Sequence, residues 1–405
     1  MTDARTFVIA GASLAGGTAA AALRERGFDA RLVVIGDETL PPYERPGLSK
    51  GYLRGEETVD DLFVRDGEWW ATHDVELQLG ERIARLDPDA NLVTLESGAS
   101  IGYDAALVAT GVQNRRLDVP GAGLGGIYSL RTVADADAIR RAAAQVSHVV
   151  LVGFGFLGCE VAASLRASGV EVEVVEIFST ALARILGEQI GRTIEAMHRD
   201  HGVTMHFDDV VERFEGNGGV ERVVTKQGRA IDTSMVVVAI GTVAAADLLP
   251  AGGSATAGGV AVDATLATWL PGVWAAGDIA LHDHPLFGPI RIEHYDNAIK
   301  MGEHVAGSML GDAAPFDDPH WFWSDQYDER LEMAGVFLTE HAVVRGSMDD
   351  RSYCAFFLDD ESRLRAAVSM GWPRDVRRSL KLIRSRVVCD PERLADPEFD
   401  LRGFL

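Results

Sequence analysis

The chain has 405 residues, 47% of them hydrophobic, and a formal net charge of -23. This length allows two or three domains with cores of their own, and the acidic balance excludes a nucleic-acid-binding protein, which needs a dominant basic surface. The apolar run Phe7 to Leu23 is rich in Gly and Ala and too short to span a bilayer comfortably, so we expect a cytoplasmic protein that does not enter a membrane. The three cysteines lie far apart without a CxxC spacing, which predicts no disulfide framework and no metal site. Redox chemistry would therefore need a bound cofactor.

The first 35 residues read as a βαβ unit, with a buried strand over 6–10, an Ala-rich helix over 14–26 and a second strand over 31–35. The loop GASLAG between them resembles a phosphate-binding glycine loop in which Ser13 replaces the middle glycine. Serine is small and its hydroxyl can donate to a phosphate, so we predict that the site is kept. A hydrolase elbow, GxSxG, would need glycine where Ala15 stands. The loop residues of the predicted site are Gly11, Ser13, Ala15 and Gly16.

The same order of elements returns at 148–176, where the loop Gly153-Phe-Gly155-Phe-Leu-Gly158 fits the complete GxGxxG fingerprint. These glycines permit a tight turn, close approach of the backbone to a pyrophosphate, and close helix packing. Glu176 ends the next strand, where a carboxylate can accept hydrogen bonds from an adenine ribose and would repel a 2′-phosphate. The sequence therefore favours NADH over NADPH. In the first unit Gly36 occupies this acidic position, so Asp37 or Glu38 would have to reach the ribose.

Alternating segments at 86–111 and 210–241 follow the two βαβ units and predict small antiparallel sheets, so the chain looks internally duplicated. From Trp321 onward, aromatic and strand-like runs predict an α+β domain. The predicted fold is α/β, with two Rossmann-like dinucleotide-binding domains of the glutathione reductase type and this C-terminal domain. We expect the FAD-binding domain over 1–114 and 245–319, the NAD-binding domain over 115–244, and the C-terminal domain over 320–405.

Several further motifs carry a resemblance that covers essentially the whole chain. They are GASLAG, GDE at 36–38, RPGLSK at 45–50, ATG at 109–111, LRT at 130–132, GFGFLGCE at 153–160, AAGD at 275–278, RIEHYDNA at 291–298 and WFWSDQYD at 321–328. With them the sequence resembles the FAD-dependent, NADH-using ferredoxin reductases of bacterial oxygenase and cytochrome P450 systems, within the flavoprotein disulfide reductase superfamily. Ser13, and Ala244-Ala245 after the IG turn, depart from the family pattern.

The resemblance implies which residues bind the cofactors FAD and NADH. Asp278 would hold a ribityl hydroxyl of FAD, although an ordinary helix cap is the alternative for this residue. Arg184 would contact the adenine end of NAD, with a solvated helix residue as the alternative. The remaining implied cofactor contacts are Arg45, Lys50, Ile83, Ala109, Thr110, Gly111, Arg131, Gly241, Gly277 and Tyr295.

Three residues are implied to take part in the chemistry. Glu160 would approach the nicotinamide and pair with Lys50, whose charge would favour reduction of the flavin. Trp323 would lie between the flavin and the redox partner, with core packing as the alternative. The implied reaction is hydride transfer from NADH to FAD, followed by two single-electron transfers to an iron–sulfur ferredoxin.

Other functions stay open at this point. A disulfide reductase needs a cysteine beside the flavin, but residues 46–50 of this chain, PGLSK, contain none. A flavoprotein that acts through partner association, similar to apoptosis-inducing factor, and a rubredoxin reductase are further alternatives. The basic stretch 372–386 could be a solvated helix face. Because ferredoxins of this kind are generally acidic by the family resemblance, we expect docking near its basic residues Arg374, Arg377, Arg378 and Lys381.

Overall fold

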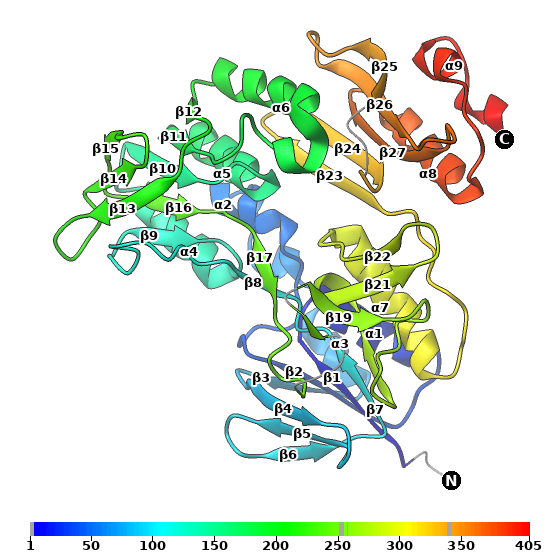
Figure 1. The fold of residues 1–405 in the computed structure, drawn as a ribbon. Helices are drawn as coiled ribbons and strands as arrows, with labels where there is room; N and C mark the ends of the chain where they lie inside the picture. Colours follow the sequence, from blue (N-terminus) through cyan, green and yellow to red (C-terminus); the bar gives the residue numbers. More distant parts are fainter. Residues whose placement is uncertain (1–3, 251–254, 257, 338–341) are drawn as a thin grey trace. The chain divides into compact units, whose positions relative to one another are not determined.

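The computed structural model describes residues 4–250, 255–256, 258–337 and 342–405 (Figure 1). The chain forms two compact units, the first from residues 1–44, 59–113 and 243–318, and the second from 45–58, 114–242 and 319–405. It passes between them along the paired strands β8 (Val112–Asn114) and β17 (Thr242–Ala244). The second unit contains both the middle and the C-terminal segments. The division into an FAD-binding, an NAD-binding and a C-terminal domain stays a prediction.

The first unit is built on a parallel sheet with the strand order β20-β7-β1-β2-β3. The predicted first βαβ unit is confirmed, because β1, α1 and β2 lie within one residue of the expected ends. The elements of this layer are β1 (Thr6–Ala10), α1 (Leu14–Glu25), β2 (Arg31–Gly36), α3 (Gly67–Thr72), β3 (Val75–Leu79), β7 (Ala105–Val108) and β20 (Val273–Ala275).

Two smaller sheets and a long helix complete the first unit. The antiparallel sheet of β4 (Ile83–Asp87), β5 (Leu92–Leu95) and β6 (Ser100–Gly102) confirms the predicted meander. Helix α7 packs against α1, and the contact is close enough that a Cβ on Gly302 would lie 2.7 Å from the carbonyl oxygen of Ala15. The remaining elements are β18 (Ala255–Thr256), β19 (Gly259–Val262), β21 (Ala280–His284), β22 (Gly288–Ile290), α7 (Tyr295–Met309) and the 3₁₀ helices Asp60–Leu62 and Gly277–Ile279.

The second unit repeats the pattern with a parallel sheet of order β12-β11-β10-β16-β9. Its strands are short and rich in valine, as expected for strands buried on both faces. The elements are the 3₁₀ helix Pro46–Ser49, α2 (Gly51–Arg54), β9 (Ile127–Ser129), α4 (Val133–Ala143), β10 (His148–Val152), α5 (Phe156–Ala167), β11 (Glu171–Val175), α6 (Ala183–Asp200), β12 (Thr204–His206), β13 (Val211–Glu215), β14 (Arg222–Thr225), β15 (Ala230–Asp232) and β16 (Val236–Val238).

The C-terminal segment of the second unit is an antiparallel sheet of order β23-β24-β27-β26-β25, with α8 packed on β24 and β27. The predicted α+β architecture is confirmed. Its elements are β23 (Trp321–Gln326), β24 (Glu329–Gly335), β25 (Ala342–Ser347), β26 (Ser352–Leu358), β27 (Leu364–Met370), α8 (Pro373–Ser385), α9 (Pro391–Ala395) and the 3₁₀ helix Leu401–Phe404. Of the helices in the described part of the chain, none has the length and apolar character needed to cross a bilayer.

Candidate active site

The GASLAG loop of the first unit runs from β1 into the N-terminus of α1. Gly11 has a φ of 127°, and a Cβ there would lie 2.2 Å from the carbonyl oxygen of Ala109, so only glycine fits. A Cβ on Gly16 would lie 2.0 Å from the carbonyl oxygen of Gly11. Ser13 is the N-cap of α1, and in the described structure its hydroxyl makes no capping hydrogen bond to the helix. The first turn of α1 also carries no acidic residue. The free N–H groups at this positive helix end suit the pyrophosphate of FAD.

Other predicted FAD contacts in the first unit surround this loop. The turn from Ala109 to Gly111 follows β7, and the Thr110 hydroxyl donates to the carbonyl oxygen of Ala245 at 2.7 Å. A Cβ on Gly277 would lie 2.8 Å from the Cβ of Ala15, so the AAGD segment also packs beside α1. Asp278 is half-buried directly after Gly277. The structure therefore brings these three segments together around one helix N-terminus.

The remaining candidates of the first unit lie further along its elements. Asp37 is exposed after β2, whereas the neighbouring Glu38 accepts a 2.6 Å hydrogen bond from the Tyr43 hydroxyl. Ile83 begins β4 and packs against the core of the unit. Tyr295 begins α7, and burial raises the pKa of its phenol well above the usual value. The two acidic residues after β2 therefore differ in their surroundings: Tyr43 holds the Glu38 carboxylate, whereas Asp37 is exposed.

The GFGFLG loop of the second unit has the geometry of a complete dinucleotide loop. Gly153 has a φ of 96°, and a Cβ there would lie 2.4 Å from the carbonyl oxygen of Ala239. A Cβ on Gly158 would lie 2.3 Å from the carbonyl oxygen of Gly153, so this glycine lets α5 pack closely on its own loop. Gly155 differs, because a Cβ on it would meet no described atom within 4 Å. It is the N-cap of α5, with no acidic residue in the first turn, and it faces open space where a phosphate would fit.

Glu176 stands directly after β11 and is only 6% exposed. One carboxylate oxygen accepts from the backbone N–H of Phe154 in the glycine loop, and the other accepts from the N–H of Phe178 at 2.9 Å. Each oxygen keeps a second lone pair that can accept from a ribose hydroxyl. Arg184 is exposed in the first turn of α6, and Gly241 is exposed with a φ of 97°. The carboxylate therefore links the phosphate loop to the predicted ribose site.

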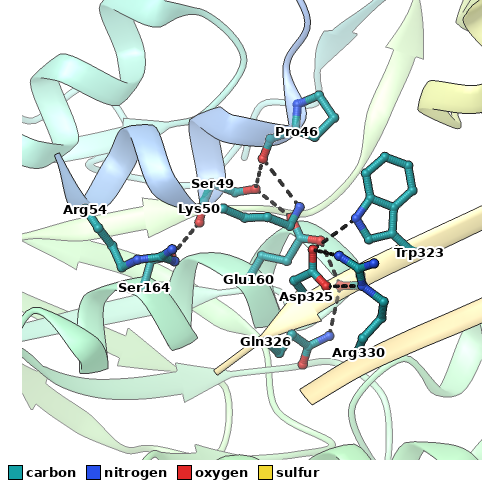
Figure 2. A network of polar contacts seen from close by, with 11 residues as sticks. Pro46, Ser49, Lys50, Arg54, Glu160, Ser164, Trp323, Asp325, Gln326 and Arg330 are labelled. Atoms are coloured by element: carbon teal, nitrogen blue, oxygen red, sulfur yellow. Dashed lines mark hydrogen bonds and ion pairs between the residues drawn. The ribbon is translucent and has the colours of Figure 1, made fainter. Parts of the chain in front are cut away.

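A buried ion pair joins Lys50 to Glu160, with 2.7 Å between Nζ and Oε2 (Figure 2). Lys50 follows the 3₁₀ helix Pro46–Ser49, and Glu160 lies in the second turn of α5. The Ser49 hydroxyl donates to the same carboxylate oxygen at 2.6 Å. The structure thus places the two side chains that the resemblance implied in direct contact, and the Glu160 carboxylate has both a cation and a hydroxyl as partners.

Two further predicted residues belong to the same unit as this pair. The Arg45 guanidinium donates to the carbonyl oxygen of Arg131, which ties the RPGLSK segment to the LRT segment. Trp323 is half-buried on β23, stacks on Trp321 with 5.1 Å between ring centroids, and donates its Nε1–H to Asp325 at 3.0 Å. It is not a fully enclosed core residue.

Sequence reasoning missed four residues that contact or extend the Lys50–Glu160 pair. Ser49 and Ser324 both donate to the Glu160 carboxylate, the latter to Oε1 at 2.7 Å. Both lie inside quoted motifs, RPGLSK and WFWSDQYD, where alternation along the strand could have marked Ser324 as inward-facing. Gln326 and His198 continue the network beyond Ser324, and His198 carries no local signal because it occupies an ordinary buried face of α6.

All three cysteines are free and buried. Burial raises the pKa of the Cys159 thiol, which lies one residue before Glu160, well above its usual value. A buried, protonated thiol is a poor nucleophile, so the cysteine chemistry of a disulfide reductase has no reactive group here.

We expect the second unit to lose stability as the pH falls from about 6.5 to about 4. Burial lowers the pKa of His198 to about 4 from its ordinary 6.5. Between pH 6.5 and pH 4, His198 is protonated in the unfolded chain but stays neutral in the folded one. The free energy of unfolding present above pH 6.5 is therefore lost through this window, by up to about 3 kcal/mol. Denaturant unfolding at pH 7 and pH 5 should show a smaller decline for His198→Gln than for the wild type. Equal declines would contradict the assignment. His282 of the first unit titrates in the same direction in both proteins.

Known proteins that resemble this chain include members of two protein families. Residues 5–302 match the pyridine nucleotide-disulphide oxidoreductase family, and residues 321–405 match the reductase C-terminal family. Rhodocoxin reductase of Rhodococcus erythropolis is 35% identical over 98% of this chain and 93% of its own. The ferredoxin–NAD(+) reductase component of the biphenyl dioxygenase system of Paraburkholderia xenovorans (strain LB400) is 36% identical over 99% of this chain and 98% of its own. The structure of a covalent putidaredoxin reductase–putidaredoxin complex matches with a TM-score of 0.94 and 28% identity, covering 99% of this chain and 98% of the other.

The fold agrees with these matches. Within the residues that the structure describes, two helix N-termini without a capping side chain or an acidic first turn are suited to the phosphates of two dinucleotides. The chain belongs to the pyridine nucleotide-disulphide oxidoreductase family, and it is an oxidoreductase that uses FAD and a pyridine nucleotide.

Proposed function

We propose that the protein oxidises NADH and passes the electrons singly to an iron–sulfur ferredoxin that serves an oxygenase or a cytochrome P450. The observation that carries the proposal is the similarity, over 99% of this chain, to a ferredoxin–NAD(+) reductase component. FAD, when bound, supplies the conversion between a hydride and single electrons. The match at 321–405 to the reductase C-terminal family extends the similarity beyond the two dinucleotide-binding segments.

Each set of residues would bind one part of a cofactor or act on the hydride transfer. Gly11, Ser13 and Gly16 would hold the pyrophosphate of FAD, and Asp278 would hold its ribityl chain. Gly153, Gly155 and Gly158 would hold the pyrophosphate of NADH. Glu176 would accept from the adenine ribose, and its negative charge would exclude the 2′-phosphate of NADPH. Lys50 would stabilise the negative charge that develops during hydride transfer, and Glu160 would hold that lysine in place.

The basic face of α8 is the proposed docking surface for an acidic ferredoxin. Arg374, Arg377 and Lys381 are exposed, follow one another at helical spacing, and have no ion-pair partner among the described residues. Arg378 differs, because its guanidinium lies 3.6 Å from Asp375 and 3.4 Å from Asp400. We therefore assign the docking charge chiefly to the three unpaired cations. An unpaired cation keeps its full field for a partner.

Reversing these charges should weaken ferredoxin use alone. In Arg374→Glu/Arg377→Glu/Lys381→Glu, we expect the KM for ferredoxin to rise by about tenfold at low salt, and the difference to shrink as salt screens the interaction. Steady-state assays with putidaredoxin as acceptor and cytochrome c as terminal oxidant measure this. Lys226→Glu, at an exposed lysine in the turn between β14 and β15, is the control for reversing a charge away from α8. Equal changes in the KM for NADH, or no change in either, would remove α8 from docking.

The proposed function is tested by coupled turnover. With NADH, a panel of [2Fe–2S] ferredoxins and cytochrome c, we expect rapid ferredoxin-dependent reduction of the cytochrome. A protein that binds FAD and NADH but gives the same slow rate with every ferredoxin and without it would instead act through partner association, and the reductase proposal would fail.

A further inference from the structure

A line of buried polar side chains runs from Glu160 into the interior of the second unit. Ser324 Oγ lies 2.7 Å from Glu160 Oε1, Gln326 Nε2 lies 3.1 Å from Ser324 Oγ, and Gln326 Oε1 lies 2.9 Å from His198 Nε2. The other imidazole nitrogen, Nδ1, lies 2.9 Å from the Tyr327 hydroxyl. Ser324, Gln326 and His198 are each at most 2% exposed, so water does not compete for these contacts.

The residue alternation along β23 produces this line. Trp321, Trp323 and Asp325 point to one face of the strand, where the two indoles stack. On this face Trp323 donates to Asp325 (Figure 2). Phe322, Ser324 and Gln326 point to the other face, where the Phe322 ring meets Phe156 of α5 at 4.8 Å. Since α5 also carries Glu160, the inward face of β23 reaches its carboxylate. Ser324 contacts the oxygen Oε1, and Lys50 contacts the other oxygen, Oε2.

The donors of this line can be assigned by elimination. Burial keeps His198 neutral, and the amide oxygen of Gln326 can only accept, so the single imidazole proton lies on Nε2. Nδ1 then accepts from the Tyr327 hydroxyl. The amide nitrogen of Gln326 donates to Ser324, which leaves the serine proton for Glu160. With the amide turned round, the Ser324 proton would go to Gln326 and the Glu160 oxygen would lose its donor.

Every donor in the assigned arrangement therefore points toward the carboxylate. Aligned hydrogen bonds polarise one another in a buried environment, so the last bond, from Ser324 to Glu160, is strengthened by those behind it. Ser49 and Lys50 act on Oε2, and Ser324 acts on Oε1, which fixes the rotation of the carboxylate group. A carboxylate fixed in this way orients the ammonium of Lys50, which lies 2.7 Å from Oε2.

We propose that Ser324, Gln326 and His198 are positioning residues for hydride transfer, and that they hold the Glu160 carboxylate in the orientation that directs Lys50. The inference rests on the proposed function for its kinetic readout. In this proposal the C-terminal segment has a second role, because β23 supplies the Ser324 hydroxyl that holds Glu160 as well as carrying Trp323. In this role β23 acts on the reaction with NADH, independently of any ferredoxin.

Two variants and one control test the proposal. Ser324→Ala removes the donor to Glu160, and we expect anaerobic reduction of bound FAD by NADH to slow about tenfold with little change in the Kd for NAD⁺. Gln326→Met leaves the Ser324 hydroxyl able to donate, so we expect a smaller slowing. Ser379→Ala removes an equally buried serine hydroxyl from α8 and should leave the rate unchanged.

A spectroscopic readout separates positioning from general damage. The infrared carboxylate band of Glu160, identified as the difference between wild type and Glu160→Gln, should shift in Ser324→Ala, shift less in Gln326→Met, and stay in place in Ser379→Ala. This band is measured without NADH or ferredoxin, so it tests the inference even if the proposed reaction is wrong. An unmoved band in Ser324→Ala, or a greater slowing in Gln326→Met than in Ser324→Ala, would overturn the proposal. If Ser324→Ala does not fold, an unmoved band in Gln326→Met together with an unchanged rate would also overturn it.

Discussion

Gly155→Asp should abolish NADH use while leaving FAD binding intact. A side chain at this position meets no described atom within 4 Å, so the fold has room for it, but it would occupy the space before the N-terminus of α5. There a carboxylate would both exclude the pyrophosphate and repel its charge. We expect the KM for NADH to rise by at least about 100-fold, equivalent to about 2.7 kcal/mol. Steady-state kinetics with a small-molecule electron acceptor measure this.

The control for Gly155→Asp is the same substitution at an exposed glycine. Gly123 belongs to the same unit, has room for a Cβ, and lies outside the glycine loop. Gly123→Asp should leave the KM for NADH unchanged, and both variants should keep the wild-type melting temperature and flavin content. If Gly155→Asp used NADH normally, the loop would not bind the nucleotide. If it lost its flavin as well, the assignment of the two loops to two different nucleotides would be wrong.

Lys50→Met should slow the reduction of bound FAD by NADH on the order of 100-fold, the usual cost of removing one group that stabilises developing charge. Methionine keeps the length of the side chain but removes its charge, and it leaves the buried Glu160 carboxylate without the cation that lies 2.7 Å away. We expect the effect on the rate of hydride transfer, with a small effect on NADH affinity. Anaerobic stopped-flow spectroscopy of the flavin absorbance separates the two quantities.

Lys226→Met is the matched control for this substitution, because Lys226 is an exposed lysine of the same unit. Its flavin should be reduced at the wild-type rate. An unchanged rate in Lys50→Met would remove the lysine from the reaction. An equal loss in Glu160→Gln would support the two residues acting as one unit, since effects within such a unit are not additive.

The sequence predicted the fold well where one face or both faces of an element are buried. The first βαβ unit appears within one residue of its expected ends, and the second lies within the expected range 148–176, because continuous apolar runs and glycine turns specify βαβ units locally. The grouping of residues 45–58 with the second unit was not predictable in this way. It depends on packing between segments more than 60 residues apart, such as the Ser164 hydroxyl that donates to the carbonyl oxygen of Ser49.

The candidate site shows the same contrast between features specified within a few residues and features that depend on distant segments. The glycines of both loops follow from steric rules that act within a few residues, and the structure brings each set to one helix N-terminus. The pairing of Lys50 with Glu160 came only from the family resemblance, since nothing local connects residues 110 positions apart. Ser324 and His198 were missed because their role depends on the inward face of β23 meeting α5 and α6. Such long-range polar contacts leave no periodic signal in a single sequence.

The central claim, that separate parts of the chain bind FAD and NADH for electron transfer, is tested most directly by anaerobic titration of the purified protein. We predict a yellow protein whose flavin absorbance is bleached by about one equivalent of NADH, and far less readily by NADPH because of the Glu176 carboxylate. A colourless protein that takes up no added FAD, or a yellow protein that neither nucleotide bleaches, would contradict the account.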